Sequence, residues 1–407
     1  MKSLHVSIIG QGYVGLPIAL AAASAGHVVK GFDLDKNIVN SLNLGVSHIE
    51  DISNDELKAL ISNGKYRATS EAGDLKGSDV VIIAVPTPLS ENRLPDVSYL
   101  ESASEIIGKN LETNTLIINE STSYPGTLRN LIKPIVEKNS KSGIIHDYAI
   151  SPERVDPGNK NWKLSNTPRL LSGITDSATK KANEFYSSFC DQIIETTSPE
   201  AAEMAKLFEN TFRQVNIALV NELAQITRSL GISVNEVIDA ASTKPYGFMG
   251  FRPGIGVGGH CIPVDPSYLA FSAKQLGIEA KFINLANEVN LEAPKNIVRR
   301  ILQENGNTLK GKTVLICGLA YKANVRDIRE SPALILRQAL ISEGATVRWH
   351  DPLVGTFAGE TSQVLNKDKF DICVISILHS TMNVSDILNS AGYVFDCTGV
   401  VKQAIQI

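Results

Sequence analysis

The chain has 407 residues, more than one hydrophobic core usually serves, so two or three domains are expected. Hydrophobic residues make up 43% and charged residues 20%, a composition typical of a soluble globular protein. The formal net charge of −4 excludes the overall basic footprint of a nucleic-acid-binding protein, so an anionic ligand must be held by locally placed Lys and Arg side chains.

The first part of the chain alternates strand-like and helix-like segments. Residues 4–9 form a continuous apolar run, which is followed by "GQGYVG" and an alanine-rich helix that ends at Gly26. Residues 28–32 predict a second strand. Further strand-like runs occur at 79–85 and 115–122. This alternation predicts a doubly wound parallel sheet.

A glycine fingerprint follows the first predicted strand. Gly10, Gly12 and Gly15 permit a tight turn, close approach of the backbone to a pyrophosphate, and close helix packing. Asp33 ends the next strand, 18 residues beyond Gly15, where its carboxylate would accept hydrogen bonds from a ribose. The pattern predicts dinucleotide binding, and because Asp33 would repel a 2′-phosphate, it favours NAD over NADP.

The segment from Ser3 to Val29 contains no Asp, Glu, Lys or Arg and is apolar enough to resemble a membrane span. Its glycines are better explained by the strand, turn and helix above, so we expect no signal peptide and no membrane anchor. The chain has five cysteines and no CxxC pair, which predicts neither a disulfide framework nor a metal site and indicates a reducing cytoplasm.

A long amphipathic helix is predicted from about Ser198, ended by Gly231. Leu207, Ile217 and Val220 add apolar side chains on its other faces, so we expect it to be buried between domains or subunits. Its main apolar stripe consists of Met204, Phe208, Phe212, Val215, Leu219, Leu223, Ile226 and Leu230.

The alternating pattern returns after a hydrophilic linker at 303–312. A helix capped by Ser331, with Pro332 in its first turn, is predicted there. The strands of this region are predicted at 313–318, 345–352, 370–377 and 393–399. We therefore predict an α/β fold of two Rossmann-like doubly wound domains joined by the long central helix and a helical middle region. The predicted domains are an NAD-binding domain at 1–197, a central helical dimerisation domain at 198–305 that carries the cysteine loop, and a second Rossmann-like domain at 306–407.

The segment "GVGGHCIPVD" places Cys261 beside His260 and four residues before Asp265. A cysteine is usually a small buried hydrophobe. Here, however, glycines allow a backbone to approach a ligand, and polar neighbours can assist a thiol that must ionise to attack. A thiolate beside a nicotinamide suggests chemistry beyond alcohol oxidation, because it can capture an aldehyde from which a second hydride then leaves.

Seven segments occur in the order and spacing of the UDP-sugar 6-dehydrogenases, over essentially the whole chain. They are "GQGYVG", "VPTPL", "ESTSYPGT", "SPERVDPGN", "EMAKLFENTFR", "GVGGHCIPVDP" and "GLAYKANVRDIRESPA". The chain resembles this family, and most of all the bacterial branch that oxidises UDP-N-acetylhexosamines.

The resemblance implies a set of catalytic residues. Cys261 corresponds to the nucleophile that forms a thiohemiacetal and then a thioester at sugar C6. Lys206 and Asn210 correspond to a pair thought to stabilise the developing oxyanion, and their i, i+4 spacing places them on one helical face. Glu153 corresponds to the acid implicated in hydrolysing the thioester. The positions that hold a catalytic water or assist proton transfer are Thr122 and Asp265.

The resemblance also implies the binding residues. The cofactor-binding positions are Gly10, Gly12, Tyr13, Val14, Gly15, Asp33, Pro86, Thr87, Ser121, Thr122 and Arg329. The substrate-binding positions are Glu153, Arg154, Val155, Lys206, Asn210, Phe248, Phe251, Arg252, Gly254, Gly258, Tyr321 and Lys322. The substrate diphosphate needs cations, which Arg252 and Lys322 would supply. Arg329 would contact either the cofactor or, as a structural ion pair, Glu330 or Asp327.

The chain departs from the animal UDP-glucose dehydrogenases at two positions. Glu120 replaces the lysine that precedes their Ser-Thr pair, and Pro157 replaces the second acid of their "PEFLAEG" segment. "RVDPGN" resembles instead the version found in enzymes that act on 2-acetamido sugars.

We therefore expect a cytoplasmic homodimer that converts a UDP-sugar, two NAD⁺ and water to a UDP-uronic acid and two NADH. UDP-N-acetylglucosamine is the favoured substrate, before UDP-N-acetylmannosamine and UDP-glucose. Two alternatives stay open. One is a two-electron hydroxyacid dehydrogenase, which would not need Cys261, and the other is a dinucleotide-binding protein without turnover.

Overall fold

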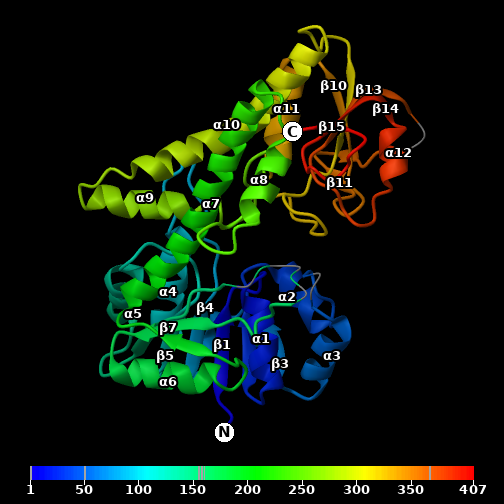
Figure 1. Ribbon diagram of the computed structural model, residues 1–407. Helices are drawn as coiled ribbons and strands as arrows, with labels where there is room; N and C mark the ends of the chain where they lie inside the picture. Colours follow the sequence, from blue (N-terminus) through cyan, green and yellow to red (C-terminus); the bar gives the residue numbers. More distant parts are fainter. Residues whose placement is uncertain (1, 50–51, 155, 157–158, 160, 366–367) are drawn as a thin grey trace. The chain divides into compact units, whose positions relative to one another are not determined.

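The computed structural model (Figure 1) describes residues 2–49, 52–154, 156, 159, 161–365 and 368–407. It divides into two compact units, of which the first ends at Phe208 and the second begins at Glu209. The boundary falls within one long helix, α7 (Pro199–Ser229), and each unit is described separately below.

The first unit is built on an eight-stranded sheet. Its strand order is β3 (Tyr66–Thr69), β2 (Val28–Phe32), β1 (His5–Ile9), β4 (Val80–Ile83), β5 (Leu116–Asn119), β6 (Asp147–Ile150), β7 (Arg169–Gly173) and β8 (Ile193–Glu195). The first six strands of this order, from β3 across to β6, are parallel to one another. Strand β7 runs antiparallel to β6 and parallel to β8. The four strands predicted from the sequence in this unit are confirmed as β1, β2, β4 and β5.

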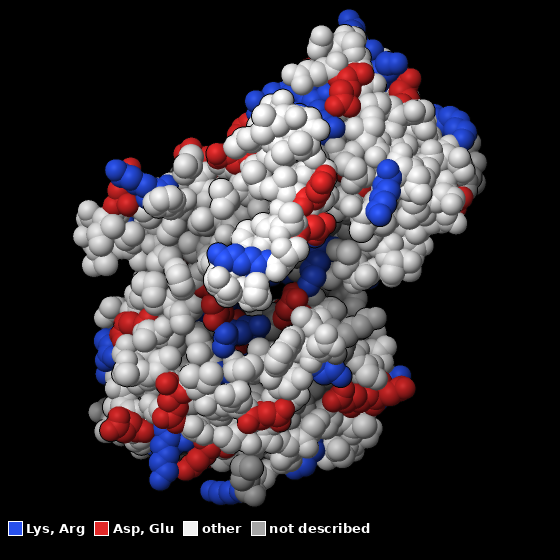
Figure 2. All heavy atoms as spheres, in the orientation of Figure 1, with Lys and Arg blue, Asp and Glu red and all other residues white. Residues whose placement is uncertain are grey.

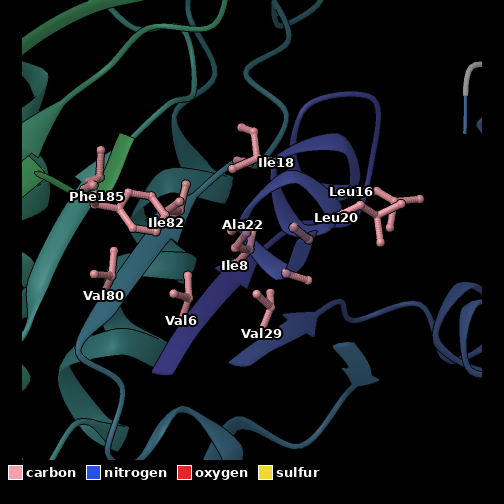
Figure 3. Packing of buried hydrophobic residues seen from close by; sticks show 14 of the residues in the cluster. Val6, Ile8, Leu16, Ile18, Leu20, Ala22, Val29, Val80, Ile82 and Phe185 are labelled. Atoms are coloured by element: carbon pink, nitrogen blue, oxygen red, sulfur yellow. The ribbon is translucent and has the colours of Figure 1, made fainter. Parts of the chain in front are cut away.

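Helices cover both faces of this sheet because each central strand is apolar on both sides. One face packs against α1 (Gly15–Ser24), α2 (Lys36–Asn43), α3 (Asn54–Ser62) and α6 (Asp176–Tyr186). Figure 3 shows Ala22 from α1 and Phe185 from α6 over the strand side chains Ile8 and Ile82. The other face packs against α4 (Ser98–Asn110), α5 (Lys133–Asn139) and the short helix η2 (Leu128–Ile132), and a 3₁₀ turn, η1 (Ala72–Leu75), lies nearby. The predicted doubly wound arrangement is confirmed.

The second unit contains a five-stranded parallel sheet. Its order is β10 (Thr346–His350), β9 (Thr313–Cys317), β13 (Phe370–Ile375), β14 (Ala391–Asp396) and β15 (Ile405–Gln406). Helices α10 (Lys281–Glu304) and α11 (Pro332–Ser342) cover one face, and α12 (Val384–Leu388) covers the other (Figure 1). Ser331 caps α11 as predicted, because its hydroxyl accepts the Ala333 N–H. The remaining elements of this unit are α8 (Val234–Ser242), α9 (Asp265–Gln275) and the hairpin of β11 (Thr356–Phe357) and β12 (Glu360–Thr361).

Helix α7 confirms the predicted long helix, and Gly231 beyond it has a left-handed φ of +72°. Leu207 and Val220 are buried, in agreement with apolar packing on more than one face. Much of the main apolar stripe is exposed in the single chain: Met204, Phe208, Phe212, Leu219, Ile226 and Leu230 are between 39% and 68% exposed. The single chain therefore leaves most of this stripe uncovered, and the burial of the helix between domains or subunits stays a prediction.

The surface carries charges of both signs. On the face drawn in Figure 2, Lys and Arg side chains are interspersed with Asp and Glu side chains on each unit. None of the helices in the described part of the chain combines the length and the hydropathy needed to cross a membrane.

The glycine turn yields a stability prediction. A Cβ at Gly15 would lie 1.8 Å from the carbonyl oxygen of Gly10, whereas a Cβ at Gly12 meets nothing within 4 Å. We expect Gly15→Ala to lower the free energy of unfolding by about 1–3 kcal/mol or more, as overpacking does. Gly12→Ala, the matched control, should change it by less than about 0.5 kcal/mol. Urea denaturation followed by circular dichroism measures both, and equal stability of the two variants would contradict the packing argument.

Candidate functional site

The glycine turn after β1 is held by hydrogen bonds to the neighbouring strand. Gly10, with φ +90°, donates its N–H to Phe32 O at 2.8 Å. The Gln11 N–H donates to Asp33 Oδ2 at 2.8 Å, which ties the turn to the predicted ribose-binding acid. Helix α1 then begins after Val14 with no acidic residue in its first turn, so its N-terminal N–H groups and dipole suit a diphosphate. The residues present fit a dinucleotide.

Gln11, between the predicted glycines, points inward. Its Oε1 accepts the Tyr66 hydroxyl at 2.8 Å, and its Nε2 donates to Ile8 O at 3.0 Å. Burial, followed by the nearby Asp33, raises the pKa of Tyr66, so the hydroxyl stays a neutral donor. Sequence reasoning missed this contact, since a glutamine in a turn is ordinarily read as exposed.

The predicted cofactor residues after β4 and β5 are tied together. The Ser121 hydroxyl oxygen accepts a hydrogen bond from the Val85 N–H at 2.9 Å. The same hydroxyl donates to Val85 O, also at 2.9 Å. Pro86 is exposed and Thr87 is buried beside this link. Because β1, β4 and β5 are parallel, these loops follow their strands at the same edge of the sheet as Gly10.

Thr122 and Lys206, both predicted catalytic residues, are in contact. The buried Lys206 ammonium on α7 donates to the Thr122 hydroxyl. One turn earlier, the buried Glu203 accepts N–H groups of Gly126 at 2.6 Å and Leu128 at 3.1 Å, and so holds the loop that carries Thr122. Burial raises the pKa of Glu203 to about 8 despite these hydrogen bonds.

Glu153, the predicted hydrolytic acid, lies just after β6. Its Oε1 accepts the Arg154 N–H at 2.6 Å, and its Oε2 accepts from Arg169 Nη2 at 3.0 Å. Arg169 also contacts Glu120, at 2.7 Å from Nη1. The Nη1 group of Arg154 donates a hydrogen bond to Pro168 O at 2.8 Å. The predicted substrate residue Val155, together with Pro157, lies outside the described residues.

Cys261 lies on a loop in the second unit, immediately before α9. Its carbonyl oxygen accepts the N–H groups of Val264 at 3.1 Å and Asp265 at 2.8 Å, which starts the helix. The buried Asp265 accepts from Asn210 Nδ2 at 2.5 Å, so this loop is anchored to α7. Cys261 is exposed, whereas the other four cysteines are buried.

The glycines before Cys261 have a packing role that their spacing did not reveal. A Cβ at Gly258 would lie 2.8 Å from Tyr321 Cβ, and one at Gly259 would lie 2.7 Å from the Tyr321 ring. The Gly259 N–H also donates to Arg329 O at 3.1 Å. The cysteine loop therefore packs directly on the segment that carries predicted substrate residues.

A buried carboxylate holds that segment. Asp351 accepts the N–H groups of Leu319 at 2.8 Å and Ala320 at 3.1 Å. His379 Nδ1 accepts the Asn324 N–H, so its proton is on Nε2, which lies 3.1 Å from Asp351. Although burial opposes ionisation, the hydrogen bonds from His379 and the backbone lower the pKa of Asp351 to about 2. The network fixes the loop on which Tyr321 and Lys322 lie.

The predicted residues of 248–254 lie near α7 and α8. Arg252 forms an ion pair with Asp239 on α8 and is half-exposed. Phe251 packs edge-on against Phe212, with ring centroids 5.8 Å apart, and Phe248 is exposed. The Gly254 N–H donates to Asn221 Oδ1 at 2.9 Å.

Arg329 is paired with Asp327, with Nη2 2.5 Å from Oδ2. This contact corresponds to one of the two alternatives that the sequence left open. The cofactor contact of Arg329 stays a prediction.

Comparison with known proteins agrees with these features. Models of the UDP-glucose/GDP-mannose dehydrogenase family match the chain in three parts: the NAD-binding domain at 4–190, the central domain at 200–292 and the UDP-binding domain at 315–403. A UDP-N-acetyl-D-mannosamine dehydrogenase from Pyrococcus horikoshii is 37% identical over 356 residues, which cover 86% of this chain and 84% of that protein.

A UDP-N-acetyl-D-glucosamine 6-dehydrogenase from Pseudomonas aeruginosa is 35% identical, over 87% of this chain and 84% of that protein. The solved structure of a UDP-ManNAc dehydrogenase from Pyrococcus horikoshii has a TM-score of 0.90 at 34% identity, and the match covers 99% of this chain and 98% of that one. The chain therefore belongs to the UDP-glucose/GDP-mannose dehydrogenase family, whose members are NAD-dependent nucleotide-sugar dehydrogenases.

Proposed function

We propose that this protein oxidises the C6 hydroxyl of a UDP-N-acetylhexosamine to the carboxylate, in a four-electron reaction through a thioester on Cys261. The observation that carries the proposal is the exposed thiol of Cys261, on a glycine loop packed against Tyr321 in a chain of this family. A dehydrogenase that stops at two electrons has no use for such a thiol.

Bound NAD supplies the hydride acceptor for both oxidations. In the first, C6 loses a hydride and its hydroxyl a proton to give an aldehyde, and the Cys261 thiol adds to it as a thiohemiacetal. Loss of a second hydride, to a second NAD⁺, together with the proton of the thiohemiacetal hydroxyl, leaves a thioester. Water then attacks the thioester carbon, the C–S bond breaks, and the thiol is regenerated with release of the acid.

The roles of the other catalytic residues follow their contacts. Lys206 and Asn210 would stabilise the oxyanion, each held by a partner, Thr122 and Asp265 respectively. Thr122 and Asp265 would also hold water or assist proton transfer. Glu153 would accept the proton of the attacking water, since its carboxylate is oriented by two hydrogen bonds.

For the substrate, we propose UDP-N-acetylglucosamine first, UDP-N-acetylmannosamine second and UDP-glucose as a poorer third. Similar proteins carry both acetamido-sugar names, which supports the sugar class and leaves the C2 configuration as our proposal. Lys322 and Arg252 would bind the diphosphate, and Arg154 is a polar partner for the acetamido group. Leaving such buried partners unpaired with UDP-glucose would cost about 1–3 kcal/mol per group.

We also propose that two copies associate through α7. Six of the eight stripe residues between Met204 and Leu230 are exposed on this 31-residue helix, and a second copy offers the same apolar stripe as its partner. None of the five cysteines is in a disulfide bond, which supports a reducing cytoplasm as the site of the reaction. The division into domains at 1–197, 198–305 and 306–407 belongs to the same proposal.

The reaction predicts its stoichiometry. With NAD and a panel of UDP-sugars, we expect two NADH per sugar oxidised, no released aldehyde, and the highest kcat/KM with UDP-N-acetylglucosamine, about ten- to a hundredfold above UDP-glucose. One NADH per sugar would contradict the mechanism, no NADH with any sugar would contradict the function, and a preference for UDP-glucose would contradict the substrate order.

The same assay on variants isolates the thiol. Cys261→Ser should form no acid yet bind NAD normally, because an alkoxide is much harder to generate than a thiolate, whose reference pKa is about 8.5. Cys373→Ala, at a buried cysteine in the sheet core of the same unit, is the matched control and should keep the stoichiometry.

The position of Asp33 predicts a preference for NAD over NADP of at least about tenfold in kcat/KM, because the carboxylate would face the 2′-phosphate. Asp33→Asn keeps an oxygen that can accept the Gln11 N–H but removes the negative charge. It should therefore lower the ratio of kcat/KM with NAD to kcat/KM with NADP. Equal use of both cofactors by the unchanged protein would overturn the role of Asp33.

Light scattering tests the association of two copies. We expect a dimer at micromolar concentration, and Leu219→Glu should shift it toward the monomer because a charge would enter the apolar stripe. Gln225→Glu, on the same helix outside the stripe, should not. A monomeric unchanged protein would refute the proposal.

A further inference from the structure

We propose that Arg169 is a positioning residue for the hydrolytic step. Its guanidinium holds the Glu153 carboxylate by a hydrogen bond, and Glu120 and Tyr186 hold the guanidinium in turn. The inference rests on the proposed function, in which Glu153 activates the water. All four side chains lie within the first unit.

Arg169 reaches this place because β7 is reversed. It is the first residue of β7, which pairs antiparallel with β6 through Ala149↔Gly173 and Ile150↔Ser172. Continuing the same register by three residues brings Arg169 opposite Glu153. A parallel β7 would place its first residue at the other edge of the sheet.

The guanidinium lies between two carboxylates. Nη1 contacts Glu120 Oε2 at 2.7 Å and Ser151 Oγ at 3.1 Å, and Nη2 contacts Glu153 Oε2 at 3.0 Å. Arg169 is 5% exposed and Glu120 is fully buried, whereas the Glu153 side chain retains 9% exposure. A buried guanidinium stays charged in proteins and requires a negative partner, so it holds both acids firmly.

Tyr186 adds a further support for the guanidinium. Its ring lies under the guanidinium, with Arg169 Cζ 4.6 Å from the ring centroid, and its hydroxyl donates to Glu120 Oε1. Both Glu120 side-chain oxygens therefore accept hydrogen bonds, and Glu120 and Tyr186 hold the guanidinium in addition to its contact with Glu153.

The consequence for Glu153 is a carboxylate that cannot rotate. Oε2 is held by Arg169 and Oε1 by the Arg154 N–H at 2.6 Å. During hydrolysis the water oxygen bonds to the thioester carbon, a water proton passes to the Glu153 carboxylate, and the C–S bond breaks as the sulfur regains a proton. A base acts well only when its lone pair is aligned with that proton, and displacements of about 1 Å can cost about a hundredfold in rate.

Glu120 accounts for one departure from the animal enzymes. Where those enzymes carry a lysine, this chain has Glu120, which is the more buried of the two acids that contact Arg169. A lysine at position 120 would instead face Arg169 with a like charge. Burial raises the pKa of Glu120, whereas the Arg169 guanidinium, the Tyr186 hydroxyl and Lys206 oppose this rise by stabilising the carboxylate, and the other charged group near it is Glu153.

Single-turnover kinetics of Arg169→Lys tests the inference. Lysine keeps the charge but, as a point donor, cannot bridge the two acids in one plane. We expect two NADH to form at the unchanged rate, followed by hydrolysis slowed about ten- to a hundredfold, with the acyl-enzyme visible by intact mass. Arg129→Lys, at an exposed ion pair with Glu200 in the same unit, is the matched control and should hydrolyse normally.

A double variant distinguishes a role of Arg169 in positioning Glu153 from a role in the stability of the surrounding structure. If Arg169 acts through Glu153, then Arg169→Lys should add no further slowing in the Glu153→Gln background, whereas a merely structural role slows both backgrounds alike. If Arg169→Lys does not fold, Glu120→Gln and Tyr186→Phe decide in its place, with a smaller slowing confined to hydrolysis.

Normal hydrolysis in these variants, or an equal loss of NADH formation and hydrolysis, would overturn the inference. The proposed function has its own control. If the unchanged protein forms two NADH and Glu153→Gln accumulates the acyl-enzyme while Arg169→Lys hydrolyses normally, only the role of Arg169 fails. If the unchanged protein forms no NADH with any UDP-sugar, the function fails and the inference with it.

Discussion

The common direction of the parallel strands is the constraint on which the first unit depends. Gly10 follows β1, Asp33 follows β2, and Glu120 follows β5, so each is delivered to one edge of the sheet. Glu153 follows β6 in the same way, and β7, which runs in the reverse direction together with β8, supplies Arg169 to that edge from the opposite direction. The predicted cofactor residues and the proposed hydrolytic acid thus share an edge without any long loop to bring them together.

The second unit uses the same device with different chemistry. Asp351 follows its strand as Asp33 follows β2, and it likewise accepts N–H groups from the loop after the adjacent strand. In the first unit that loop is a glycine turn open at Gly12, which suits a diphosphate. In the second unit, the loop after β9 is held by His379, which accepts the Asn324 N–H, and this loop packs against the glycines before Cys261. The same architecture therefore forms the NAD-binding domain in the first unit and supports the loop of the proposed nucleophile, Cys261, in the second.

Sequence reasoning predicted the features that local patterns encode. Apolar runs predicted β1, β2, β4 and β5, a three-to-four-residue period predicted α7, and Ser331 with Pro332 predicted the start of α11. The strands β3 and β6 to β8 were not predicted. They are about as short as the predicted strands, but a charged residue, Arg67, Asp147, Arg169 or Glu195, breaks the apolar run in each of them. What covers the apolar stripe of α7 stays a prediction, because periodicity shows that a face is apolar and not what packs against it.

For the site, the resemblance supplied residue types and the structure supplied their contacts. Nothing in the spacing joins Lys206 to Thr122 or Asn210 to Asp265, because these pairs are 84 and 55 residues apart in the chain. Arg169 was missed for a similar reason: its role depends on the register between β6 and β7. The unusual Glu120 was the one sequence signal that pointed toward it.

The central claim is that Cys261 carries the substrate carbon as a thioester, and peptide mapping tests it most directly. Glu153→Gln protein would be incubated with NAD and UDP-N-acetylglucosamine, quenched in acid, digested and analysed by mass spectrometry. The account predicts that the peptide containing Cys261 gains the mass of one UDP-uronyl group and loses it on treatment with hydroxylamine. NADH formation with Cys261 unmodified, or the same mass on one of the four buried cysteines, would contradict the account.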